Sequence, residues 1–137
     1  MRNLDNQKDL IIMSVTRPDL TIQEQVKALH ELINDLNSCG LFINAASAEG
    51  RFCGEPELSV VAVVKPGEED LALKYALSRA YDYGQDTVLL RQPGNVWLVE
   101  TNDQFRQRIG SEIVQHNDLR NLPDNCTILR DVVWVVK

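Results

Sequence analysis

At 137 residues and 15.5 kDa, the chain is long enough for one domain with a substantial core and too short for two. Hydrophobic residues make up 44% of it and charged residues 25%, as in ordinary soluble globular proteins. The formal net charge of -6, without any run of Lys and Arg, argues against nucleic-acid binding, because contacts to phosphates need clustered cations.

Metal binding and membrane insertion are not expected either. The three cysteines, Cys39, Cys53 and Cys126, show no Cys-x-x-Cys spacing, and the two histidines, His30 and His116, lie far apart. This argues against a zinc site and against a disulfide framework. The N-terminus is polar, and no apolar run approaches the roughly 20 residues that span a bilayer. We therefore expect a cytoplasmic protein.

The chain begins with a predicted strand and helix. Residues 10–15 are an apolar run typical of a strand buried on both faces, and Pro18 prevents its continuation. Thr21 and Glu24 have the spacing of a capping box. Gly40 is placed to end the helix in the left-handed conformation. Between them, apolar residues at intervals of three and four predict one face of a helix of about 16 residues: Ile22, Val26, Leu29, Ile33 and Leu36.

Residues 50–64 are the stretch around which we expect the rest to be organised. Their first half holds two glycines and a proline, and their second half is rich in β-branched residues. A second strand over residues 41–46, a loop from residue 47 and a third strand over 58–65 predict a hairpin with the glycines at its bend.

A second helix and a second hairpin follow. Three acids at 68–70 suit the positive end of a helix, and Gly84 is placed to end it. Residues 86–91 and 96–100 predict two strands joined by a tight turn at 92–95. The second helix has a wide apolar face made of Leu71, Leu73, Tyr75, Ala76, Leu77, Ala80 and Tyr81.

The last third is less regular. Residues 101–125 are polar without a clear period, and we expect a helix over 103–114 that is interrupted at Gly110. A turn at 121–125 then leads into a single terminal strand over 126–136.

This order of elements predicts a single α+β domain of the split βαβ kind over residues 1–137. Two helices would cover one face of a mostly antiparallel sheet. The other face must be polar or covered. Trp97, Trp134 and the apolar terminal strand make an oligomeric interface a reasonable way to cover it.

No nucleophile elbow, phosphate loop, dinucleotide fingerprint or metalloprotease motif is present. Triad chemistry is rejected, because His30 lies beside an apolar helix stripe and His116 lies in the least regular segment. Polar residues at the ends of strands remain as candidates.

Glu55 and Glu57 lie where the central turn becomes a strand, and Glu57 and Ser59 project from the same side of it. A carboxylate beside a hydroxyl can hold an ammonium group or a ribose. Solvated turn residues are the other interpretation of the two glutamates. Two further polar pairs flank strands and equally fit capping or turn roles: Gln85 with Asp86, and Ser14 with Arg17.

The combined order of these motifs over residues 10–100 resembles the phage S-adenosylmethionine (SAM) lyases, long called SAM hydrolases. The matching segments are Ile-Ile-Met-Ser-Val-Thr-Arg at 11–17, Gly-Leu-Phe at 40–42, Gly-Arg-Phe-Cys-Gly-Glu-Pro-Glu-Leu-Ser-Val at 50–60, an alanine-rich helix, and Tyr-Gly-Gln-Asp-Thr-Val-Leu-Leu at 83–90. A wider set of uncharacterised bacterial and phage domains shares this layout.

The resemblance implies a ferredoxin-like α+β domain assembled as a homotrimer, with active sites between subunits. The reaction it implies is non-hydrolytic. The methionine carboxylate of SAM attacks its own γ-carbon, which releases 5′-methylthioadenosine and homoserine lactone without a metal or cofactor. A phage would use this reaction in the host cytoplasm to deplete the methyl donor of restriction–modification. The alternative is a non-enzymatic phage or bacterial protein of the same fold that binds a host protein or a nucleotide.

The resemblance also implies roles for individual residues. Glu57 matches the family's essential glutamate and would hold the cationic part of SAM in the reactive pose. Phe52 is the position closest to a family tyrosine and lacks its hydroxyl. The candidate substrate-binding residues are Ser14, Arg17, Phe52, Glu55, Ser59, Gln85 and Asp86.

Overall fold

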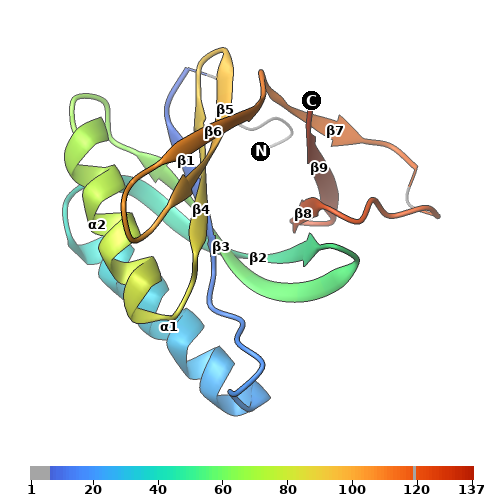
Figure 1. Ribbon diagram of the computed structural model, residues 1–137, viewed down its shortest axis with the longest axis horizontal. Coiled ribbons are helices and arrows are strands. Elements are labelled where there is room, and N and C mark those ends of the chain that lie inside the picture. The colour runs from blue at the N-terminus through green and yellow to red at the C-terminus, as the bar shows by residue number, and fades with distance from the viewer. Residues whose placement is uncertain (1–6, 119) are drawn as a thin grey trace.

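The computed structural model describes residues 7–118 and 120–137 (Figure 1). None of the described helices is long and apolar enough to cross a membrane. In chain order the elements are β1 (Leu10–Ser14), α1 (Ile22–Ser38), β2 (Phe42–Phe52), β3 (Glu55–Val64), α2 (Glu69–Asp82), β4 (Thr87–Gln92), β5 (Asn95–Glu100), β6 (Arg106–Gly110), β7 (Ile113–His116), β8 (Cys126–Leu129) and β9 (Val132–Val136).

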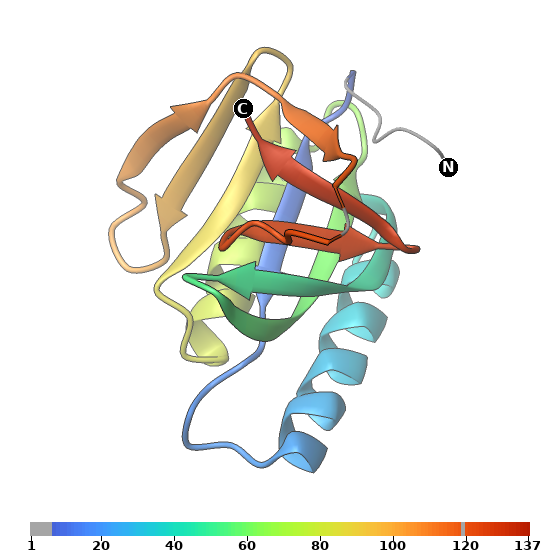
Figure 2. The ribbon, with the colours of Figure 1, turned by 90° about the vertical axis from the view of Figure 1, so that its right-hand side faces the viewer.

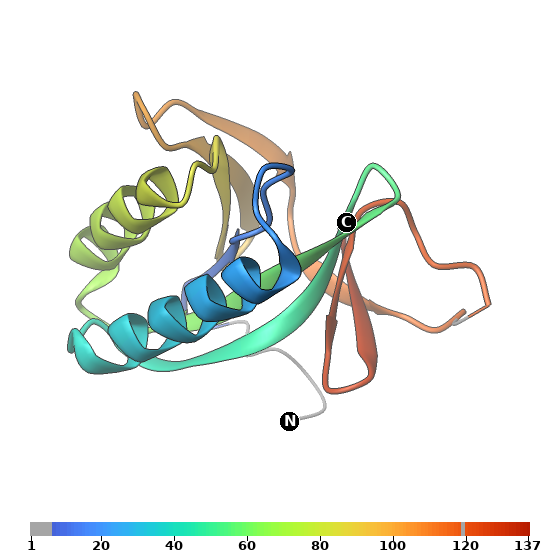
Figure 3. The ribbon, with the colours of Figure 1, turned by 90° about the horizontal axis from the view of Figure 1, so that it is seen from below.

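The described strands form one nine-stranded sheet in the order β6-β5-β4-β1-β3-β2-β8-β9-β7. All eight neighbouring pairs run antiparallel. Both helices lie on one face of the sheet, as Figure 3 shows. The predicted antiparallel sheet with two helices on one face is therefore confirmed.

The expected ferredoxin-like sandwich needs correction. The split βαβ arrangement is present in the strand order β4-β1-β3-β2, with α1 and α2 connecting its strands. Five further strands extend this core at both edges. Because strands twist relative to one another, a sheet this wide curls, and here it forms an open half-barrel (Figure 2). The face opposite the helices is thus concave and is partly covered by the chain's own C-terminal strands.

The two faces of the central strands differ in chemistry, because successive side chains point to opposite sides. The helix side is a continuous apolar core that includes Ile11, Met13, Val60, Ala62, Val88 and Leu90. On the concave side, β1 and β3 present Ile12, Ser14, Glu57 and Ser59. One tryptophan lies on each side: Trp97 packs against the helix-side core, and Trp134 packs against Leu10.

The ends of α1 form as predicted, but its buried face is rotated. The Thr21 hydroxyl accepts the Glu24 N–H at 3.1 Å, and the Glu24 carboxylate accepts the Thr21 N–H at 2.9 Å, which completes the capping box. Ile22 and Val26, expected in the core, are 68% and 37% exposed. The buried stripe is Gln25, Ala28, Leu29, Leu32 and Leu36. Two overlapping stripes satisfy the same spacing, and the small Ala28 allows the closer approach to the sheet.

The second helix also ends as predicted, and part of its apolar face is exposed. Gly84 follows it with a positive φ of 72°. Leu71 and Tyr81 are exposed, and the buried residues are Ala72, Ala76, Leu77 and Ala80. Small alanines again face the sheet.

The central hairpin is longer than predicted. The expected loop from residue 47 is part of β2, which continues to Phe52. The bend is only Cys53 and Gly54, whose φ angles of 50° and 83° fit a two-residue type I′ turn. Glu55 therefore begins β3 and does not lie in a turn.

The helix predicted over residues 103–114 is wrong, because this segment forms β6 and β7. β6 is an edge strand, and its Arg106, Gln107 and Arg108 are exposed. Edge strands favour charged residues that discourage pairing with other chains, so they lack the alternation that identifies a strand. The prediction of a single terminal strand is also wrong, because β8 and β9 form a hairpin around Arg130 and Asp131, which both have a positive φ.

Gly110 joins the two outer edges of the sheet. It ends β6, and β7, at the opposite edge, begins at Ile113. The Ser111 N–H donates to the Lys137 carbonyl at 2.8 Å, which holds the corner against the C-terminus. A Cβ at Gly110 would lie 2.5 Å from the Val136 Cγ1 and 2.9 Å from the Lys137 carbonyl oxygen. Only a glycine lets these segments approach so closely.

Candidate functional site

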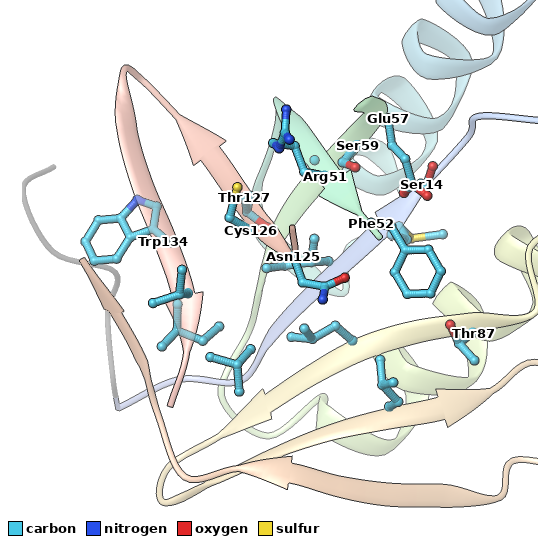
Figure 4. A pocket seen from close by; sticks show the side chains of 18 of the residues that line it. Ser14, Arg51, Phe52, Glu57, Ser59, Thr87, Asn125, Cys126, Thr127 and Trp134 are labelled. Carbon is cyan, nitrogen blue, oxygen red and sulfur yellow. The ribbon is translucent and has the colours of Figure 1, made fainter. Parts of the chain in front are cut away.

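The concave face holds a cavity of about 410 Å³ between the central strands and the C-terminal hairpin (Figure 4). This volume lies within the range of roughly 300–1,000 Å³ that is usual for small-molecule sites. Its polar lining residues are Ser14, Arg51, Glu57, Ser59, Thr87, Asn125 and Thr127, and its apolar ones include Ile12, Phe52, Leu89, Leu98, Ile109, Ile113 and Trp134.

Glu57 is the acidic group of this cavity. Its carboxylate is half-buried, and desolvation by burial raises the pKa of the group, while a hydrogen bond with Ser14 acts in the opposite direction. Within the described residues, no cationic side chain forms an ion pair with it. A partly buried carboxylate without a counter-charge is costly, and a cationic ligand would remove that cost.

The Ser14 hydroxyl fixes the surroundings of Glu57. It accepts the Thr16 N–H at 3.0 Å, and its one proton is within reach of both the Leu58 carbonyl, 3.2 Å away, and the Glu57 carboxylate. The Thr16 hydroxyl in turn accepts the Leu58 N–H at 2.8 Å. The end of β1 is thereby tied to β3, so the Glu57 side chain is held by a rigid part of the sheet.

Ser59 and Gly50 form the floor of the cavity beside Glu57. Ser59 is opposite Ser14 in the sheet and is only 3% exposed, and its hydroxyl forms no hydrogen bond within the described part of the chain. Gly50 is opposite Glu57, and a Cβ there would lie 2.7 Å from the Ser59 Oγ. The backbone of Gly50 is not left-handed, so glycine is needed here to leave room for the Ser59 side chain and not for conformation.

Two predicted site residues lie at or beyond the edge of the cavity. Phe52, at the end of β2, lines it and is 60% exposed. Glu55 is exposed at the start of β3 and does not line the cavity.

The other three predicted site residues lie away from the cavity. Arg17 pairs with Asp19 at 2.7 Å. The Gln85 amide donates to the Thr16 carbonyl at 2.9 Å, and the Asp86 carbonyl accepts the Thr101 N–H at 2.9 Å. In this chain these contacts hold the segments that follow β1 and α2.

The C-terminal side of the cavity was missed by sequence reasoning. Asn125, Thr127 and Trp134 come from the segment whose role could not be predicted. The available signal was the polar pair Arg130–Asp131 between two short apolar runs, and it was weak because the pair lacks the glycine or asparagine of a usual two-residue hairpin turn.

This wall is fastened to the central hairpin. The Asn125 Oδ1 accepts the Cys53 N–H at 3.0 Å, and the Asp124 carbonyl accepts the Gly54 N–H at 2.9 Å. The Arg51 Nε donates to the Pro123 carbonyl at 3.2 Å. The central turn therefore holds the entrance of β8 in place.

Among residues 7–118 and 120–137, no three His, Cys, Asp or Glu side chains come together as ligands for a metal ion. Neither histidine lines the cavity: His30 is exposed on α1, and His116 contacts the Asn121 carbonyl at 3.1 Å.

No family model matches the sequence, and no curated protein matches it either. Among solved structures, a phage SAM lyase in its apo state aligns with the chain at 19% identity and a TM-score of 0.40. The alignment covers 82% of this chain and 96% of that one. The likeness is weak and concerns the fold.

Proposed function

We propose that this protein is a SAM lyase that cleaves SAM to 5′-methylthioadenosine and homoserine lactone. The observation that carries the proposal is Glu57, a half-buried carboxylate that lacks a cationic partner among the described residues and faces a cavity of ligand size. The sulfonium and ammonium groups of SAM would supply the missing positive charge. The sequence resemblance described above selects SAM among the possible cations.

The proposed reaction is an intramolecular substitution. An oxygen of the methionine carboxylate forms a bond to the γ-carbon of the same substrate while the bond from that carbon to sulfur breaks. The electron pair of the broken bond stays on sulfur, which becomes the neutral thioether of 5′-methylthioadenosine. The nucleophile and the leaving group both belong to the substrate, so no proton transfer is needed in this step.

The protein's contribution is to hold the substrate in a folded pose and to keep water away. Glu57 would attract the cationic part, and Ser14 and Ser59 beside it offer hydroxyl groups to the polar atoms of the methionine portion. The apolar walls contributed by Leu89 and Leu98 limit the access of water. Positioning of this kind can supply several kcal/mol of the barrier reduction, on the order of 7–11 kcal/mol in the best intramolecular cases.

Four of the predicted site residues lie outside the cavity of a single chain: Arg17, Glu55, Gln85 and Asp86. They can contribute to the proposed site only if a second copy of the chain brings them there. In the trimer implied by the resemblance, active sites lie between subunits, and a neighbouring copy would bring such residues to Glu57. Light scattering is expected to give a trimer, and a strict monomer would contradict this part of the proposal. The biological role that follows is phage counter-defence in the host cytoplasm.

The test is incubation of the purified protein with SAM in heavy-oxygen water, followed by chromatography and mass spectrometry. The expected products are equal amounts of 5′-methylthioadenosine and homoserine lactone, without heavy oxygen in the lactone at early times. Heavy oxygen in the side-chain hydroxyl of homoserine would show hydrolysis at the γ-carbon and contradict the lyase mechanism.

One observation favours a second candidate, a binding protein without turnover. Phe52 lines the cavity and is the position closest to the family tyrosine, whose hydroxyl it lacks. A chain that binds SAM in calorimetry but forms no 5′-methylthioadenosine would support this candidate. Phe52→Tyr is the variant that tests the cause, because a gain of turnover would trace the deficit to the missing hydroxyl.

A further inference from the structure

Four residues of the cavity stand in one line across four neighbouring strands. Glu57 on β3 is opposite Gly50 on β2, Gly50 is opposite Thr127 on β8, and Thr127 is opposite Trp134 on β9. Residues directly opposite each other in an antiparallel sheet share a face, and all four line the cavity. With neighbouring strands about 4.8 Å apart, the line runs roughly 14 Å from Glu57 to Trp134 along the sheet.

The far end of this line carries two polar groups that no described residue satisfies. Neither the Thr127 hydroxyl nor the Trp134 indole N–H forms a hydrogen bond within residues 7–118 and 120–137, although Trp134 is only 5% exposed. Neither atom is among the buried polar atoms that lack a partner in the described part of the chain, so both are open to solvent and have water or a ligand as their available partner. Both residues line the cavity, so a bound molecule can be that partner.

At the middle of the line, Gly50 brings no side chain of its own and the Ser59 side chain lies against its backbone. Gly50 has no Cβ, and the space that a Cβ would occupy lies 2.7 Å from the Ser59 Oγ. An elongated ligand with one end at Glu57 and the other at Trp134 would therefore cross β2 over the Ser59 hydroxyl, without a Gly50 side chain in its way.

One end of the line lies in the part of the chain that resembles the SAM lyases, and the other end lies outside that part. Glu57 lies within the residues that resemble the SAM lyases, whereas β8 and β9 lie outside them. The hydrogen bonds of Cys53 and Gly54 to Asn125 and Asp124 hold β8 beside the central hairpin. The spacing between the acidic end and the indole end is therefore fixed by the fold.

We propose that the hairpin β8–β9 binds the nucleoside half of the substrate, an inference that rests on the proposed function. The Trp134 indole contacts the adenine and donates its N–H to a ring nitrogen, and the Thr127 hydroxyl bonds the ribose. Glu57 holds the cationic half at the other end of the line. This assigns a binding role to the C-terminal third of the chain.

The test uses two half-ligands. 5′-Methylthioadenosine carries the nucleoside without a charge, and S-methylmethionine carries the sulfonium without a base. The chain has two tryptophans, so in Trp97→Phe the emission comes from Trp134 alone. Trp97 lies on the helix side, where its indole donates to Gln92 at 3.0 Å, so the cavity stays intact. We expect 5′-methylthioadenosine to change this emission.

Isosteric variants separate the two ends. Thr127→Val is expected to lower the affinity for 5′-methylthioadenosine about 3- to 10-fold, the effect of one hydrogen bond, and to leave the affinity for S-methylmethionine unchanged. Glu57→Gln is expected to lower the affinity for S-methylmethionine and to leave the affinity for 5′-methylthioadenosine unchanged. Thr87→Val is the matched control, because Thr87 lines the cavity from β4, off the line, and its loss should leave the nucleoside affinity unchanged.

The outcomes distinguish this inference from the proposed function. If both Thr127→Val and Trp134→Phe cleave SAM with an unchanged KM, the inference is wrong and the proposed lyase activity is still supported. Binding of 5′-methylthioadenosine at Trp134 without cleavage of SAM would support the inference and refute the lyase. If 5′-methylthioadenosine binds without changing the Trp134 emission and binds Thr127→Val as tightly as the wild type, the nucleoside lies elsewhere and the inference is wrong.

Discussion

Replacement of Gly50 by alanine should block the cavity at little cost to the fold. The new methyl group would lie 2.7 Å from the Ser59 Oγ and 3.7 Å from the Cβ atoms of Glu57 and Ser59. Overpacking of this kind costs about 1–3 kcal/mol. Because the backbone of Gly50 suits alanine, the less flexible unfolded chain returns about 0.4–1 kcal/mol. The expected net loss of stability is roughly 0–2.6 kcal/mol.

The effect on ligand binding should be larger. A ligand that fits above Ser59 meets the same crowding as the methyl group, so we expect SAM to bind about 5- to 150-fold more weakly to Gly50→Ala, the equivalent of about 1–3 kcal/mol. The assay is calorimetric titration with SAM, with thermal melting of the same samples.

The double variant Gly50→Ala with Ser59→Ala provides the control. Removal of the Ser59 Oγ relieves the close contact, so the melting temperature should recover, while the methyl group still fills the floor and binding stays weak. If Gly50→Ala binds and cleaves SAM like the wild type, the space above Ser59 is not used by the substrate and the placement of the site is refuted.

Two further predictions concern pH and closure of the sheet. Burial raises the pKa of Glu57, so the folded protein holds this proton more tightly than the unfolded chain, and the contribution of Glu57 to stability falls as pH rises from its ordinary pKa through the raised one. Glu57→Gln should remove that dependence in melting curves recorded at about pH 4 to 8, and SAM affinity of the wild type should fall as the pH drops through the same interval. If the melting temperatures of the variant and the wild type change with pH in the same way, this prediction is contradicted. Gly110→Ala places a methyl group against the Val136 side chain and the Lys137 carbonyl, and it should lower the melting temperature by roughly 3–10 °C; an unchanged melting temperature would show that the corner can relax.

The first two thirds of the fold could be predicted because local chemistry decides them. The capping box of Thr21 and Glu24, the glycines at 40 and 84, and the hairpin around β4 and β5 are all specified within a few residues of sequence. The placement of Glu57 and Ser59 on one side of a strand followed from the same local rule.

The C-terminal third could not be predicted because its structure depends on distant contacts. β6 is a charged edge strand that only its pairing with β5 identifies. The cavity exists because the sheet curls until β9 faces the central strands, and no local pattern indicates which residues meet across that curve. Thr127 and Trp134 therefore entered the site only once the strand order was known.

The same lack of long-range information explains the predicted site residues that lie elsewhere. Arg17 lies in the connection from β1 to α1 and Gln85 in the connection from α2 to β4, both outside the sheet, whereas Glu57 is part of β3. Sequence order shows that a polar residue lies at the end of a strand, and it does not show which face or which edge that end reaches.

The most direct measurement is the rate at which 5′-methylthioadenosine forms from SAM in the wild type, in Glu57→Gln and in Glu55→Gln. The two variants make the same change two positions apart on β3, and only Glu57 lines the cavity. We predict that Glu57→Gln loses turnover and keeps its melting temperature, while Glu55→Gln keeps a much larger share of the wild-type rate, because Glu55 lies outside the cavity of its own chain. Absence of product in the wild type, or equal rates in the wild type and Glu57→Gln, would contradict the account.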